Sequence, residues 1–100
     1  MDRFILIVND HDDYYMFPVS SFIGADFGLA TSTNLYFEKA PMAYSFKFTH
    51  ADGHAPMFLK EFGDLCNMSP KNVIEFNDVS GHYDSDYITS VSGGTPIVVR

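Results

Sequence analysis

Residues 20–68 read SSFIGADFGLATSTNLYFEKAPMAYSFKFTHADGHAPMFLKEFGDLCNM, a stretch in which two strand patterns lead into one helix pattern. Apolar and polar residues alternate along Thr33–Glu38 and again along Tyr44–His50, as they do in strands with one buried face. The link between these two runs is short enough for a hairpin turn. Residues 55–68 then place apolar side chains at helical spacing on one side. Two paired strands followed by a single helix predict a small α+β domain.

The helix pattern also predicts the core of the domain. Apolar residues that recur every three to four positions form one stripe, which must pack against the apolar face of a sheet. On the helix we expect the buried residues to be Phe58, Leu59, Phe62, Leu65 and Cys66, and on the sheet Leu35, Phe37, Phe46, Phe48 and Phe76.

The N-terminal flank adds two predicted strands. Phe4–Val8 is a continuous apolar run, which is typical of a strand that is covered on both faces or used in assembly. Tyr14–Val19 predicts a second strand, and Pro18 places it at a sheet edge because proline has no N–H to donate. Residues 20–32 contain two glycines and several hydroxyl residues, so we expect an extended connection there.

The C-terminal flank is also β-rich. Val73–Phe76 predicts a strand, and residues 77–86 predict an acidic loop. Tyr87–Val91 and Pro96–Val99 predict two closing strands around a Gly-Gly turn. We therefore expect an antiparallel sheet with a single amphipathic helix packed on one face.

Length and charge limit the function classes. One hundred residues suffice for one domain, residues 1–100, and a hydrophobic content of 46% is ample for a packed core. Thirteen acidic residues against six basic ones give a net charge of −7, which repels phosphate backbones and anionic lipid surfaces. We therefore expect neither nucleic acid nor a membrane as a partner.

The single cysteine and the apolar run Phe4–Val8 exclude further classes of protein. Cys66 alone forms neither an intrachain disulfide nor a zinc site that needs two thiolates. Phe4–Val8 is too short for the apolar region of a signal peptide, and an acidic segment follows it at once. We expect a protein that is not secreted by a signal peptide and that folds in a cytoplasm, with a place in a particle as the alternative.

Three segments combine histidine with aspartate: residues 10–13, 50–54 and 82–86. Both residue types bind metals and transfer protons, but all three segments fall in or beside predicted loops, where polar residues are usual. Pro56 fits the first turn of the helix, so the two histidines of residues 50–54 precede it and do not share a helical face. We predict no catalytic residue, no cofactor and no metal site, with a metal site in one of these segments as the alternative.

Three stretches, Pro18–Gly28, Thr31–Ala40 and Tyr44–Asn67, resemble small proteins encoded by marine bacteriophages, especially cyanophages. Together they cover about half of the chain, and they are strand, turn and helix patterns rather than catalytic signatures. The resemblance therefore carries over no functional residue. It implies a structural protein such as a virion or capsid-decoration subunit, and it favours a trimer among the homo-oligomers.

Two hypotheses of different classes follow. The first is a non-enzymatic structural or interaction protein that acts as a homo-oligomer, because a surplus of aromatic residues often marks subunit contacts. The residues that we expect at its interface are Phe4, Ile5, Ile7, Tyr15 and Phe17. The alternative is an acidic host-takeover or inhibitor protein that binds a basic surface on a host protein. An oligomer in solution favours the first hypothesis, and a monomer favours the second.

Overall fold

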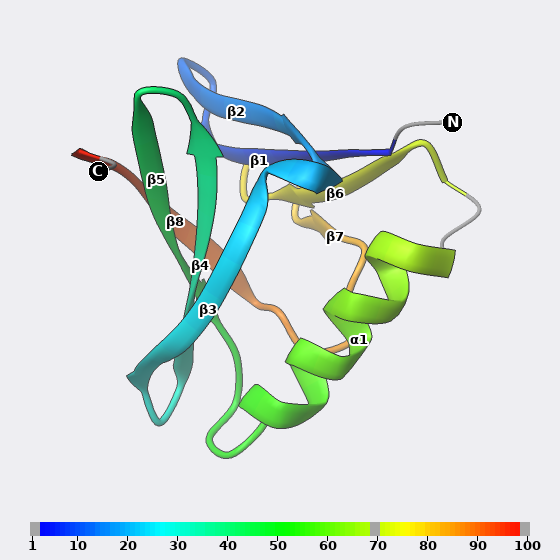
Figure 1. Cartoon of the computed structure of the whole chain (residues 1–100). Helices are drawn as coiled ribbons and strands as arrows, with labels where there is room; N and C mark the ends of the chain where they lie inside the picture. Colours follow the sequence, from blue (N-terminus) through cyan, green and yellow to red (C-terminus); the bar gives the residue numbers. More distant parts are fainter. Residues whose placement is uncertain (1–2, 69–70, 99–100) are drawn as a thin grey trace.

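The computed structural model describes residues 3–68 and 71–98, which form two four-stranded sheets and a 14-residue helix (Figure 1). In chain order the elements are β1 (Phe4–Asp10), β2 (Asp13–Pro18), the 3-10 helix η1 (Val19–Ser21), β3 (Phe22–Leu29), β4 (Ser32–Lys39), β5 (Met42–Thr49), α1 (Ala55–Met68), β6 (Val73–Asn77), β7 (His82–Tyr83) and β8 (Ser90–Val98). The predicted α+β class is confirmed.

The strands divide into two sheets rather than the single sheet that we expected. In sheet A the order is β2-β1-β6-β7, and β1 runs antiparallel to β2 but parallel to β6. In sheet B the order is β3-β4-β5-β8, and all neighbours are antiparallel. Because β1 pairs with β6, the N-terminal strands β1 and β2 belong to sheet A and do not continue the hairpins of sheet B.

The central hairpin and the helix agree with the sequence analysis. Lys39 pairs with Met42, so Ala40 and Pro41 form the turn between β4 and β5. Alternation along both strands buries Leu35, Phe37, Phe46 and Phe48 completely, as predicted. The helix spans the predicted residues 55–68.

Several segments differ from the prediction. The predicted acidic loop of residues 77–86 contains the two-residue strand β7, which pairs with β6. Residues 20–32 are not a connection, because they contain η1 and the eight-residue strand β3, which pairs with β4. The glycines of Ser92–Thr95 do not turn the chain, because β8 continues through them as one strand. Gly93 and Gly94 have φ of 116° and 89°, which suits glycine, and the pairing with β5 shifts by one residue beside them. Val99, the last residue of the predicted closing strand, lies outside the described residues.

Aromatic rings join the two sheets and the helix into one core. The ring of Phe17 on β2 stacks on Phe37 of β4 with centroids 5.1 Å apart, which connects sheet A to sheet B. Phe48 of β5 makes an edge contact with Phe76 of β6 at 5.0 Å and stacks on Phe58 of α1 at 5.6 Å. Offset and edge contacts of this kind stabilise beyond the area that they bury.

The helix residues in the core match the prediction except for one. Phe58 and Phe62 are buried, and the side chains of Leu65 and Cys66 are half-buried against the core. Leu59 is 36% exposed, because it lies toward the edge of the apolar stripe. The predicted burial of Leu59 is therefore wrong.

Candidate assembly surface

Alternation along β1 sends its side chains to two opposite faces of sheet A. Ile5 and Ile7 are fully buried toward the core, so Leu6 and Val8 between them point to the other face. In the register with β2, Leu6 lies beside Met16 and Val8 lies beside Tyr14. Met16 is 50% exposed and Tyr14 is 65% exposed. The neighbouring strands β1 and β2 are therefore apolar on both faces.

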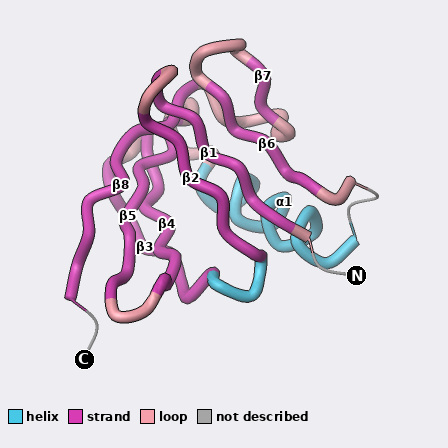
Figure 2. Tube along the Cα trace, turned by 90° about the horizontal axis from the view of Figure 1, so that it is seen from above, coloured by secondary structure: helices cyan, strands magenta, loops and turns pink. Residues whose placement is uncertain are grey.

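We call this second apolar surface the outer face of sheet A. Its residues are Phe4, Leu6, Val8, Tyr14, Met16, Pro18 and Val73. Apart from the two exposed residues of β2, they are half-buried by their neighbours in the sheet. Seen from above in Figure 2, β2, β1 and β6 lie in front of α1, so the helix covers the opposite side of the sheet.

A polar strip borders the outer face of sheet A along β6. Glu75 pairs with Leu6, and Asn77 pairs with Val8. The amide of Asn77 donates a hydrogen bond to the Glu75 carboxylate at 2.8 Å. An apolar centre with a polar border is the arrangement found at protein–protein interfaces.

The predicted interface residues lie on β1 and β2, but most of their side chains face the core. Ile5, Ile7 and Phe17 are 0%, 0% and 2% exposed, so their side chains belong to the core and offer no surface to a partner. Tyr15 packs on Phe17 and is half-buried on the same inner face. β1 is also not an edge strand, because β2 and β6 flank it. Of the predicted set, only Phe4 lies on the outer face.

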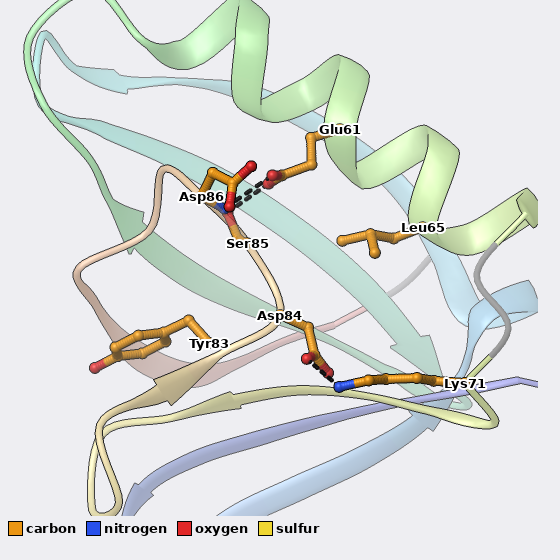
Figure 3. Close-up of a pocket in the computed structure, with 7 residues that line it drawn as sticks. All are labelled: Glu61, Leu65, Lys71, Tyr83, Asp84, Ser85 and Asp86. Carbon is orange, nitrogen blue, oxygen red and sulfur yellow. Dashed lines mark hydrogen bonds and ion pairs between the residues drawn. The ribbon is translucent and has the colours of Figure 1, made fainter.

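A pocket of about 390 Å³ lies between α1 and the segment around β7 (Figure 3). On its β7 side, the Asp84 carboxylate accepts hydrogen bonds from the Lys71 ammonium at 2.6 Å, His82 Nε2 at 3.0 Å and the Glu75 N–H at 2.8 Å. Burial of Asp84 would by itself raise its pKa, but these hydrogen bonds outweigh burial and hold the pKa below the usual 3.8. Asp84 therefore ties β6 to β7.

The helix side of the same pocket is tied to the chain after β7. The Glu61 carboxylate accepts hydrogen bonds from the Ser85 hydroxyl and from the Asp86 N–H at 2.9 Å. Figure 3 shows Glu61 reaching across to these two residues. The carboxylates of Glu61 and Asp84 are thus engaged in holding the 82–86 segment against the helix and the sheet, which is a structural role.

Tyr83 connects the same segment to β8. Its hydroxyl donates a hydrogen bond to Asp78 Oδ1, which also accepts from the Val91 N–H at 3.1 Å. Burial and the neighbouring Asp78 carboxylate raise the pKa of Tyr83 to about 12, so its ring stays neutral.

The first two His/Asp segments, residues 10–13 and 50–54, differ in their exposure to solvent. His50, expected in a loop or at a strand end, follows β5 but is only 2% exposed. Its Nδ1 lies 2.8 Å from the Ala51 carbonyl oxygen and donates to it, since a carbonyl only accepts. In the neutral ring Nε2 then accepts from the Thr33 hydroxyl at 2.8 Å. The 10–13 segment lies at the exposed turn between β1 and β2.

Among residues 3–68 and 71–98, no three His, Cys, Asp or Glu side chains lie close enough together to hold a metal ion. Cys66, on the half-buried side of α1, is a poor nucleophile because burial raises the pKa of its thiol to about 11, despite the nearby Arg3.

Comparison of this chain with protein-family models, curated proteins and solved structures finds no match. Within the described part of the chain, α1 and the other helical segment lack the length and apolar character that a membrane crossing requires.

Proposed function

We propose that this chain is a non-enzymatic structural or interaction subunit that works as a homo-oligomer, and that the outer face of sheet A is its main self-contact. The observation that supports this proposal best is that Tyr14 and Met16, on the edge strand β2, are exposed beside the apolar side chains of β1. Full burial of a methionine side chain stabilises by about 1.5–3 kcal/mol, so half-exposed Met16 still has roughly 1 kcal/mol to gain.

Charge favours a second copy at this face. Each copy carries a net charge of −7, so two copies repel unless they meet where acidic side chains are few. None of the residues that define the outer face of sheet A is charged, and on the bordering strand β6 the Glu75 carboxylate accepts a hydrogen bond from the Asn77 amide. The face therefore lets two copies approach without opposing carboxylates at its centre.

The resemblance to small marine-phage proteins gives the proposal its biological setting, a virion or capsid-decoration subunit. A flat face that meets its own copy does so across a two-fold axis, so a dimer is the building block that this surface supports, in place of the trimer favoured by the resemblance. Mass spectrometry of purified particles of the phage that encodes the chain tests this setting, and absence from the particle would contradict it.

The assembly itself is tested by light scattering after size-exclusion chromatography. We expect the unmodified chain to be oligomeric and Met16→Glu to dissociate it, because the new carboxylate must be buried without a partner. Met57→Glu is the matched control, since Met57 is 44% exposed on α1 and outside sheet A. A monomer at high concentration, or an oligomer unaffected by Met16→Glu, would contradict the proposal, and a monomer would favour the acidic inhibitor.

A further inference from the structure

The two sheets leave four edge strands in the described part of the chain, and three of them are poorly suited to pairing. β2 contains Pro18, β8 contains Pro96, and β7 is only two residues long. Proline and short length are common ways in which proteins protect a sheet edge from other chains. β3 differs, because it is eight residues long and contains no proline, lysine or arginine (Figure 1).

β3 also carries three strongly exposed apolar side chains. Phe27 is 76% exposed, Leu29 is 59% exposed and Ile23 is 53% exposed. The one charged residue of the strand, Asp26, accepts a hydrogen bond from the Tyr36 hydroxyl at 3.0 Å on the neighbouring strand β4. The edge is thus apolar, and its single carboxylate is engaged within sheet B.

We propose that β3 is a second self-contact, in which β3 of one copy pairs antiparallel with β3 of another copy across a two-fold axis. This inference rests on the proposed homo-oligomer, and it names a separate contact within it. The pairing joins two copies of sheet B into one continuous sheet and satisfies the free backbone groups along both edges.

The geometry of β3 restricts the register of this pairing. The pairing with β4 shifts at Phe22–Gly24 and again at Phe27–Leu29, so residues 24–27 are the regular part of the strand. A two-fold axis perpendicular to the sheet keeps every side chain on its own face. Opposed residues must therefore share a face, and the axis must pass beside one residue and its own copy.

Charge then selects which residue lies on the axis. Asp26 on the axis would place two carboxylates directly opposite each other, which destabilises a strand pair. Ala25 on the axis instead places Asp26 opposite Gly24 of the second copy, and no heavy atom lies near the position that a Gly24 side chain would occupy. The same register brings Phe27 beside Ile23 of the second copy, so that two exposed apolar side chains cover each other.

A disulfide test reads this register directly. In a Cys66→Ser background, Ala25→Cys places two thiols opposite each other, where the Cα atoms of an antiparallel pair are about 4.5–5.5 Å apart, within the range of a disulfide. Leu29→Cys is the control, because two copies of residue 29 are then eight residues apart along the strand, roughly 26 Å. Under mild oxidation we expect most of Ala25→Cys to shift to the dimer band of a non-reducing gel, while Leu29→Cys stays monomeric.

The same variants separate this contact from the outer face of sheet A. Adding Met16→Glu to the Ala25→Cys protein should leave the cross-link in place, because the two contacts lie on different sheets. Cross-linking of Ala25→Cys no faster than that of Leu29→Cys would overturn the inference. If Met16→Glu still dissociated the oligomer, the proposed function would survive that result. If Ala25→Cys cross-links efficiently but Met16→Glu leaves the mass of the oligomer unchanged, the β3 contact is retained and the contact through the outer face of sheet A is rejected.

Discussion

At the scale of single residues, the buried pair of Thr33 and His50 is a polar contact inside an aromatic core. Thr33→Val removes the hydroxyl that donates to His50 Nε2 and leaves that nitrogen buried without a partner. An unsatisfied buried acceptor costs about 1–3 kcal/mol, so we expect a loss of stability of that size in urea denaturation. Thr31→Val, at an exposed side chain, should change the midpoint little, and equal effects of the two substitutions would contradict this role.

Asp84 makes the stability of the folded protein depend on pH. Its pKa is lowered in the folded protein, so the stability that it contributes is fully present above the ordinary carboxyl pKa of 3.8 and is lost as the pH falls through the folded-state pKa. Denaturation midpoints measured from pH 7 down to pH 2.5 should therefore fall less steeply below pH 4 for Asp84→Asn than for the unmodified chain. Asp12→Asn, in the exposed β1–β2 turn, should keep the original slope. The same slope in both variants would reject the role of Asp84.

At the scale of elements, the buried side chains of Phe58 and Phe62 hold α1 against the sheets. Phe62 is 2% exposed and contacts Phe22 at 5.0 Å and Phe37 at 6.4 Å, so Phe62→Ala opens a cavity between β3, β4 and the helix. We expect a cost of about 3–5 kcal/mol in chemical denaturation, a large part of the stability of a domain this size. Leu59→Ala on the same helix should cost much less because Leu59 is partly exposed. An unchanged midpoint for Phe62→Ala would contradict the packing.

The elements also show why the sequence predicted some strands and missed others. β4, β5 and α1 carry a clear period with their turn and helix-start residues, so local patterns sufficed. β3 was missed because its glycines and neighbouring hydroxyl residues resemble a loop, and because most of its apolar residues, unlike Phe22, face solvent rather than the core. Ile5 and Ile7 were expected at an interface, although they are buried, because Phe4–Val8 is apolar throughout and shows no alternation. Only the partners of β1, which are distant in sequence, show that Ile5 and Ile7 point inward.

At the scale of the whole molecule, the two proposed contacts determine what kind of assembly forms. The outer face of sheet A and the β3 edge belong to different sheets, so one copy has both surfaces available at once. Two different two-fold contacts on one subunit build either a closed tetramer or an open row of copies, whereas one contact alone stops at a dimer. The mass of the unmodified protein in solution should therefore exceed that of a dimer. Loss of either contact should leave a dimer that is held by the other contact.

The parallel pairing of β1 with β6 affects how the chain is made. β1 is translated well before its partner β6 (Val73–Asn77), because β2 to β5 and α1 lie between them in the sequence. Until β6 is made, the edge of β1 that pairs with it is unpaired, and both faces of the β1–β2 hairpin expose apolar side chains. Contacts between segments so distant in sequence also form slowly. A chain that ends before Val73 lacks β6, so the edge of β1 that pairs with β6 stays without its partner and is open to aggregation.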